Sequence, residues 1–237
     1  MRVLIVSPHF DDAPLSLGQS MLDGWLSQHD LTVGVVFSSS NYTRWFHPTR
    51  RRAPLATAIR RFEERVNSRR FHYRVITAGY EEAVLRLNSM STESFLRPDY
   101  DAHDDPLLPA ITTCIAEWAR SFDAVLGPLG IGDHIDHHLA AAATHFASAN
   151  HLLVGFYEDR PYCSYLSDQE IAACVNQRHP GLVPTNRQTP IGRHLHHQLW
   201  YPSQFSEVFT TAARLDLGLA RAERVWANPN ALEGWTS

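Results

Sequence analysis

The sequence predicts an α/β protein with a Rossmann-like, three-layer α/β/α arrangement and a mostly parallel sheet. Apolar runs alternate along the chain with stretches of helical spacing. The runs are apolar throughout rather than at every second position, as in parallel strands that helices cover on both faces. The chain has 237 residues and shows no repeat and no low-complexity linker. We therefore expect residues 1–237 to form a single domain.

The first elements follow directly from this alternation. The apolar run at 2–6 predicts a buried strand, and leucines at helical spacing predict a helix at 14–28. The sequence LTVGVVF at 31–37 predicts a second buried strand. Residues 38–54 are polar, aromatic and rich in arginine, which predicts a loop.

The middle of the chain continues the pattern. Helical spacing at 55–69 and 106–120 predicts helices, and apolar runs at 71–76 and 123–126 predict strands. The proline at the start of 106–120 is tolerated because the first turn of a helix does not need its N–H. Residues 80–104 follow neither period, so no element is predicted there.

The last third is less regular. An Ala-rich helix at 135–149 and a buried strand at 152–156 complete the alternating part. Residues 158–205 contain five prolines and predict an irregular excursion. Helical spacing at 206–226 predicts a helix that closes the chain.

Composition excludes several classes of function. The net charge of −4 and the pI of about 6.4 give no electrostatic reason to expect nucleic acid or a membrane as a partner. All 21 basic residues are arginine, which excludes lysine-based catalysis. Three scattered cysteines indicate neither a disulfide framework nor a cysteine zinc site. No run has the length of a membrane span and the start does not resemble a signal peptide, so we expect a cytoplasmic protein. The sequence leaves open whether the protein forms a homo-oligomer.

A histidine and two aspartates follow the first predicted strand, in the sequence SPHFDD at 7–12. Ligands of open α/β sheets bind at this edge, outside the carboxyl ends of the strands. His9 and Asp12 offer a nitrogen and a carboxylate oxygen, a pair that zinc accepts. Asp11 lies between them and does not easily point the same way, so we expect it to act as a base beside the metal.

A second cluster, DHIDHH at 133–138, follows the strand predicted at 123–126. In a parallel sheet both clusters lie at the same edge, where His9, Asp12 and His137 could form a three-ligand site. Three protein ligands leave one position for a water, which is typical of catalytic rather than structural zinc.

The other residues of the second cluster can support this chemistry. A protonated His134 could stabilise an oxyanion or supply a proton to a leaving amine. Asp136 could hold one of the imidazoles in place.

Each cluster also has a purely structural interpretation. Alone, the segment at 9–12 is more often a helix start with a solvated histidine, because aspartate is a favoured N-cap residue. The cluster at 133–138 is harder to explain in this way, because histidine and aspartate are costly to bury without partners. The presence of both clusters after strands of one sheet favours the metal site.

Two further groups are weaker candidates. The sequence HDD at 103–105 follows no strand, and Asp105 before Pro106 predicts a helix start. The three histidines within 194–197 have the spacing of a helix or loop surface, so a metal role for them is a minority interpretation.

The paired motifs PHFDDAPLSLG at 8–18 and GDHIDHH at 132–138 resemble those of the LmbE-like, or PIG-L, family of zinc-dependent N-deacetylases. Members of this family remove acyl groups, usually acetyl, from amino sugars and related conjugates. The resemblance implies the LmbE-like version of the three-layer fold and one zinc ion per chain. Fe²⁺ or Co²⁺ would suit a similar ligand set.

The resemblance also implies a role for each motif residue. It implies His9, Asp12 and His137 as the zinc ligands. It implies Asp11 as the general base for a metal-bound water that attacks the amide. It implies His134 as the histidine that stabilises the transition state, and Asp136 as the carboxylate that supports this histidine.

Other segments resemble the family less specifically. RRFEE at 60–64 resembles a helix whose arginine reaches the substrate, which implies Arg61 as a substrate-binding residue. In the loop at 38–54, Arg44 could bind an anionic group and Trp45 could stack on a sugar ring, or both could belong to a solvated loop. YEDRPY at 157–162 and YPSQ at 201–204 resemble late segments of one bacterial branch.

The chain departs from the family pattern at three positions. Ala13 replaces the usual glutamate, Phe10 the usual proline and Gln19 the usual second glycine. Gln19 would narrow or repolarise the site and is therefore a fourth substrate-binding candidate, which leaves the exact substrate open.

Three functions are compatible with these residues. The first is zinc-dependent removal of an N-acyl, usually acetyl, group from an amino sugar or its conjugate. The second is hydrolysis of a non-sugar amide in a natural-product or thiol-conjugate pathway, which the loop at 41–52 allows. The third is a non-catalytic sugar-binding relative, which Ala13 and Gln19 suggest and the intact Asp11 and His134 oppose. The expected partner of an enzyme is a small N-acylated molecule.

Overall fold

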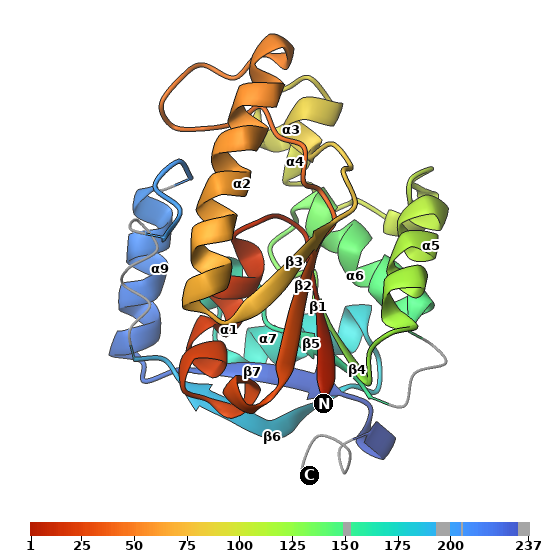
Figure 1. The fold of residues 1–237 in the computed structure, drawn as a ribbon. Coiled ribbons are helices and arrows are strands. Elements are labelled where there is room, and N and C mark those ends of the chain that lie inside the picture. The colour runs from red at the N-terminus through yellow and green to blue at the C-terminus, as the bar shows by residue number, and fades with distance from the viewer. Residues whose placement is uncertain (149–152, 193–199, 205, 232–237) are drawn as a thin grey trace.

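The computed structural model describes residues 1–148, 153–192, 200–204 and 206–231, and a single seven-stranded sheet runs through it (Figure 1). The strands are β1 (Arg2–Ser7), β2 (Asp30–Val35), β3 (Tyr73–Thr77), β4 (Ala124–Pro128), β5 (Val154–Tyr157), β6 (Val183–Pro190) and β7 (Ala222–Ala227). Their order in the sheet is β3-β2-β1-β4-β5-β7-β6. The first five are parallel, and β7 pairs antiparallel with both β5 and β6.

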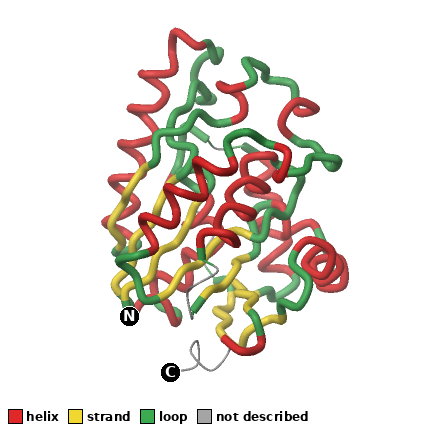
Figure 2. Tube along the Cα trace, turned by 90° about the vertical axis from the view of Figure 1, so that its right-hand side faces the viewer, coloured by secondary structure: helices red, strands yellow, loops and turns green. Residues whose placement is uncertain are grey.

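Helices cover both faces of the sheet, with α1 and α2 on one side and α5 and α6 on the other (Figures 1 and 2). The α-helices are α1 (Asp12–Leu22), α2 (Ala53–Arg70), α3 (Ala83–Arg86), α4 (Thr92–Phe95), α5 (Leu108–Ala119), α6 (Ile135–Ala147), α7 (Asp168–Arg178) and α9 (Glu207–Gly218). Short 3-10 turns lie at Trp25–Gln28, Arg50–Arg52, Ala102–Asp104, Tyr162–Tyr165 and Pro229–Ala231. This arrangement confirms the predicted three-layer α/β/α class.

Successive residues of β1 point to opposite faces of the sheet. Val3 and Ile5 belong to a buried cluster with residues of α1, whereas Leu4 and Val6 pack with residues of α5 and α6. Because a helix covers each face, all four side chains are fully buried. This double cover explains why the strand is apolar at successive positions.

Two of the predicted helices end earlier than the sequence predicts. The helix predicted at 14–28 ends at Leu22, and a separate 3-10 turn follows after Gly24. The helix predicted at 206–226 ends at Gly218, and residues 222–227 form β7. Ala220 takes a positive φ of 48° between them, which a continuous helix does not allow.

The excursion predicted at 158–205 is more regular than its prolines suggest. It contains α7, which begins with a capping box between Ser167 and Glu170, and the edge strand β6. Pro184 and Pro190 lie in β6, where an edge position tolerates the missing N–H groups. Among the described residues, no helix combines the length and apolar character that a bilayer crossing requires.

Helix α2 docks on the core through a buried carboxyl group, which predicts a specific pH dependence of stability. Glu64 accepts hydrogen bonds from the hydroxyls of Tyr73 at 2.8 Å and Tyr201 at 2.7 Å. Burial raises the pKa of Glu64 to about 8. The folded protein therefore holds a proton there that the unfolded chain releases near pH 4.5, so this group lowers stability progressively as the pH rises from about 4.5 to about 8.

We expect Glu64→Gln to remove that pH dependence, because a carboxamide does not ionise. Urea unfolding at pH 6 and at a pH above 8 measures the free energy of unfolding under both conditions. Between them, the wild type should lose on the order of a few kcal/mol of this free energy, whereas the variant should keep it. The exposed Glu93→Gln is the matched control and should behave as wild type. An equal slope in Glu64→Gln and wild type would contradict this assignment.

Candidate metal centre

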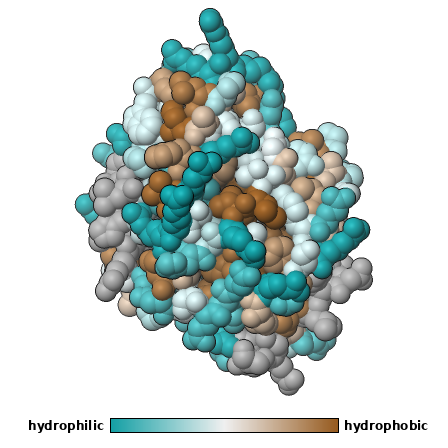
Figure 3. All heavy atoms as spheres, in the orientation of Figure 1, coloured by the Kyte–Doolittle hydropathy of each residue, from teal (hydrophilic) through white to brown (hydrophobic). Residues whose placement is uncertain are grey.

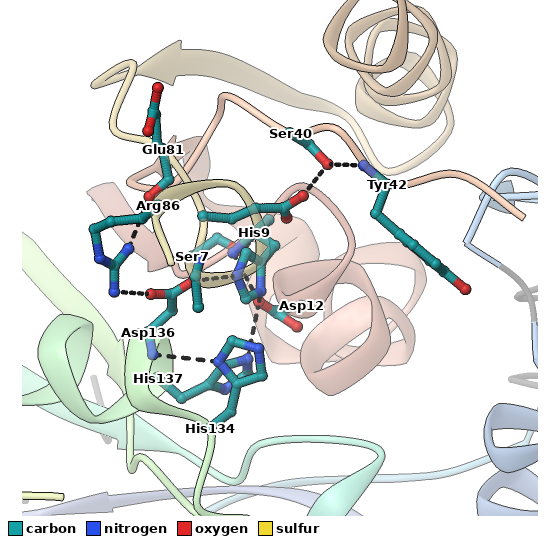
Figure 4. A network of polar contacts seen from close by, with 12 residues as sticks. Ser7, His9, Asp12, Ser40, Tyr42, Glu81, Arg86, His134, Asp136 and His137 are labelled. Atoms are coloured by element: carbon teal, nitrogen blue, oxygen red, sulfur yellow. Dashed lines mark hydrogen bonds and ion pairs between the residues drawn. The ribbon is translucent and has the colours of Figure 1, made fainter. Parts of the chain in front are cut away.

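The two sequence motifs meet at the carboxyl edge of the sheet, between β1 and β4. The strand order reverses at this point, because β1 has β2 on one side and β4 on the other. Such a switch point opens a crevice between the loops that leave the two strands. The 7–12 segment leaves β1 directly, and the 133–138 segment forms the start of α6 after β4. The predicted shared edge is therefore confirmed (Figure 4).

Three buried ligand atoms converge there. The Oδ2 atom of Asp12 lies 3.1 Å from Nδ1 of His9 and 3.3 Å from Nε2 of His137. Together the three residues form a group whose ligand atoms lie within 4.8 Å of one another. Ligand atoms of a tetrahedral zinc site lie roughly 3.3 Å apart, given bonds of about 2.0–2.2 Å. The donor set and its spacing therefore fit a divalent cation.

Each histidine of this group turns its other nitrogen to a carboxylate. Nε2 of His9 lies 3.0 Å from Oδ2 of Asp136, and Nδ1 of His137 lies 2.7 Å from Oδ1 of Asp159. A carboxylate behind a histidine fixes the ring orientation and its tautomer, and strengthens it as a metal ligand. The structure thus contains two carboxylate–histidine pairs that point at one place.

The carboxylates give this pocket a strongly negative character. Burial alone would lower the pKa of His9, but the charges of Asp12 and Asp136 outweigh it and raise the pKa to about 10. Burial also opposes the shift at His137, where Asp12 and Asp159 raise the pKa to about 9. In the protein without a cation, the imidazoles therefore hold protons that a divalent ion would displace on binding.

Asp136 contacts residues that the sequence did not indicate. Its Oδ1 accepts a hydrogen bond from Arg86 at 2.8 Å and its Oδ2 one from the backbone N–H of Ala83 at 2.7 Å. Both donors come from α3, within the stretch at 80–104 that followed neither period. The Asp136 carboxylate is hydrogen-bonded to His9 rather than to His134, and its support of His134 stays a prediction.

His134 is held through its backbone neighbour instead. It is the N-cap residue of α6, and its Nδ1 accepts a hydrogen bond from the N–H of Asp136 at 3.2 Å. Burial lowers the pKa of His134 well below its usual value, so the ring is neutral at neutral pH. With Nδ1 as an acceptor, the ring hydrogen lies on Nε2.

Comparison with known proteins finds a similarity to a deacetylase. No family model matches it. The 2'-N-acetylparomamine deacetylase of Streptomyces fradiae is 32% identical over 192 residues, which are 77% of this chain and 65% of that protein. The chain therefore spans just under two thirds of this relative's length. Its two motifs, joined in one site, agree with this similarity. The similarity to this deacetylase and the paired motifs agree with the resemblance to the LmbE-like, or PIG-L, family.

Two solved structures share the fold of this protein. A teicoplanin deacetylase in complex with teicoplanin superposes with a TM-score of 0.66 at 18% identity, covering 95% of this chain and 97% of that one. The N,N'-diacetylchitobiose deacetylase from Pyrococcus horikoshii gives 0.57 at 14% identity, covering 97% and 84%. At such low identity these matches bear on the fold alone.

Asp11, the expected base of this site, is the N-cap residue of α1 but does not cap it through its side chain. Its Oδ1 instead lies 3.1 Å from Nη2 of Arg60, a buried residue of α2. Nη1 of Arg60 lies 2.6 Å from Oε2 of Glu82. The ring of Phe10, which replaces the family's proline, lies 5.7 Å from the Arg60 guanidinium.

The arginine expected to reach the site is therefore displaced by one residue. Arg60 points inward, whereas Arg61 is exposed and lines a separate surface hollow of about 610 Å³. Successive residues of a helix differ by 100° in direction, so a shift of one position exchanges an inward for an outward side chain.

The remaining substrate-binding candidates do not contact the ligand group. Arg44 and Trp45 are exposed in the loop at 38–54, where the N–H of Arg44 donates to the carbonyl of Ser203. Gln19 lies two turns along α1 from Asp12, and its carboxamide donates to Asp23. Their roles toward a substrate stay predictions.

Asp159 is the functional candidate that the sequence analysis missed. It lies two residues beyond β5, the strand next to β4, so its backbone leaves the same edge of the sheet. Its position after a buried strand was the available signal. The 103–105 cluster instead forms a 3-10 turn that Asp101 caps, and the histidines within 194–197 lie outside the described residues.

Proposed function

We propose that this protein is a metal-dependent hydrolase that removes an N-acyl group, in the first place acetyl, from an amino sugar or an amino-sugar conjugate. The observation that carries the proposal is the convergence of His9, Asp12 and His137 on one point, with Asp11 and His134 beside them. Amide hydrolysis needs a centre that activates water and residues that transfer protons, and this crevice would supply both.

Three residues would hold the cation: His9 through Nδ1, Asp12 through Oδ2 and His137 through Nε2. A divalent ion bound there supplies a Lewis acid and lowers the pKa of a water toward neutrality. Zinc suits the two nitrogens and one oxygen, and Fe²⁺ or Co²⁺ are the alternatives.

Asp11 acts as the general base and then carries the proton to the departing amine. Its side chain is only 8% exposed, so bulk water does not compete for the proton. Arg60 holds one oxygen of this carboxylate, at 3.1 Å, and keeps it oriented toward the site. Glu82 shares the guanidinium of Arg60, which limits the positive charge that Asp11 experiences.

His134 stabilises the negative charge that develops on the amide oxygen. Its Nε2–H is a donor even in the neutral ring, because Nδ1 is engaged by the N–H of Asp136. A neutral, preoriented donor in a buried site costs no reorganisation when the charge appears.

The substrate class is supported by the names of similar proteins. The Streptomyces fradiae relative is named a 2'-N-acetylparomamine deacetylase. Of the two fold relatives, one is named an N,N'-diacetylchitobiose deacetylase and the other is a deacetylase in complex with teicoplanin. Amine release from 2'-N-acetylparomamine and from diacetylchitobiose, measured beside a simple acetylated alkylamine, tests the preference. Equal turnover of the alkylamine would favour a non-sugar amide as the substrate.

The metal is tested by elemental mass spectrometry of wild type and Asp12→Ala. We expect about one divalent ion per chain in wild type and almost none in the variant, because the variant removes the only carboxylate ligand of the group. Asp104→Ala, in the exposed HDD sequence, is the control and should keep its ion. A wild-type protein without metal after reconstitution would overturn the proposed mechanism.

A further inference from the structure

Helix α2 presents an apolar stripe to solvent. Leu55, Ile59, Phe62 and Val66 recur at helical spacing, and Leu55, Phe62 and Val66 are 54%, 66% and 42% exposed. The opposite face of the same helix is polar and buried, with Arg60, Glu63, Glu64 and Asn67 turned inward. An ordinary surface helix has the reverse arrangement, so the outward stripe calls for an explanation other than packing of this chain.

Positive charge gathers along one flank of this stripe and in the loop before the helix. Residues 44–70 carry nine of the 21 arginines and only two acidic residues, both buried. On the helix, Arg61, Arg65 and Arg69 are exposed and follow one flank of the stripe. Among the residues that the structure describes, none of these three forms an ion pair, whereas Arg50 pairs with Glu81. The net charge of −4 conceals this asymmetry, because the rest of the chain carries the excess of acidic residues.

We propose that this surface, the α2 face, docks on an anionic lipid bilayer. We define the α2 face as Leu55, Ile59, Phe62, Val66, Arg61, Arg65 and Arg69, with exposed Trp45 from the preceding loop. Arginines beside leucine and phenylalanine on one helix face are the composition of interfacial helices, and Trp45 in the preceding loop adds an aromatic side chain of the kind found in them. Charge complementarity selects the lipid source, since acidic headgroups attract each basic residue near the surface.

Charge also argues against a second copy of the chain on this face. In a symmetric pair with antiparallel α2 helices the two stripes would meet, and each arginine flank would lie against its own copy. Such like-charge contacts are unfavourable, whereas an acidic bilayer neutralises the arginines and covers the apolar side chains together.

The α2 face lies at the outside of the molecule, where Arg61, Phe62 and Arg65 also line the surface hollow beside Glu81. Figure 1 shows α2 as a long helix on the outside of the molecule, with the loop before it at one end. Figure 3 shows hydrophobic patches along this side of the molecule, next to strongly hydrophilic side chains. The inference concerns this outer surface and does not depend on the proposed hydrolysis.

Co-sedimentation with vesicles tests the docking. Wild type should pellet with phosphatidylcholine vesicles that contain phosphatidylglycerol, should not pellet with phosphatidylcholine alone, and should be released by high salt. Each arginine near an acidic surface strengthens partitioning roughly fivefold, so Arg61→Gln/Arg65→Gln/Arg69→Gln should weaken it about 100-fold. Leu55→Ser/Phe62→Ser should weaken it at least tenfold.

Matched variants elsewhere on the surface provide the control. Arg120→Gln/Arg214→Gln and Leu219→Ser change exposed residues of the same types and should bind vesicles as wild type does. Absence of binding to the acidic vesicles, or equal binding by the α2 variants, would overturn the proposal. A doubled mass in light scattering that Leu55→Ser/Phe62→Ser abolishes would also overturn it, since the occupant would then be a second copy.

Discussion

Asp11→Asn should lower kcat for N-deacetylation roughly 10³-fold while the metal content stays at the wild-type value. The carboxamide keeps the shape of the side chain but does not accept the proton of the attacking water. Asp11 is not a member of the three-ligand group, so the cation should stay bound. The experiment combines single-turnover rates with elemental analysis of the same samples.

The matched control is Asp104→Asn, which changes an exposed aspartate outside the site and should leave the rate unchanged. Loss of metal in Asp11→Asn would show that this residue is a ligand rather than a base. An unchanged rate with the metal present would remove Asp11 from the mechanism and, with it, the proposed proton path.

Asp159→Asn should weaken metal binding by about 10- to 100-fold. The carboxylate lies 2.7 Å from Nδ1 of His137 and orients Nε2 toward the other ligands. The carboxamide of Asn lacks the negative charge that strengthens the His137 imidazole as a metal ligand. Competition of the protein with a zinc chelator at fixed pH measures the change.

Glu158→Gln is the control for this variant, because Glu158 is equally buried but turns away from the site to Arg224 and Trp226. It should keep the wild-type metal affinity even where it lowers stability. Equal losses of affinity in the two variants would mean that the effect of Asp159→Asn comes from general disruption near β5.

The convergence of the proposed metal ligands was predictable because a physical rule connects them. His9 and His137 are distant in sequence, but parallel strands end at one edge, and each residue follows a strand that its apolar run identifies. The three-layer class was predictable for a similar reason, since double burial leaves a continuous apolar run. Helix–strand boundaries near Ala220 were not, because a turn of three residues interrupts a helical pattern only slightly.

The residues around the ligands were harder to predict, because tertiary contacts alone decide them. The choice between Arg60 and Arg61 depends on the rotation of α2, which the charged pattern RRFEE does not fix. The partner of Asp136 depends on α3, a single turn that is too short for periodicity to reveal. Asp159 was hidden by its neighbours, since the proline-rich sequence after it reads as a loop.

The residues proposed as ligands are synthesised at very different times during translation. His9 and Asp12 leave the ribosome early, but Asp136 and His137 follow more than a hundred residues later, and Asp159 later still. A nascent chain that lacks β4 and the start of α6 has two ligands and no carboxylate behind His9. A cation would therefore find the complete proposed site only when most of the parallel sheet has been synthesised, so maturation of such a centre would be a late event in the biogenesis of the protein.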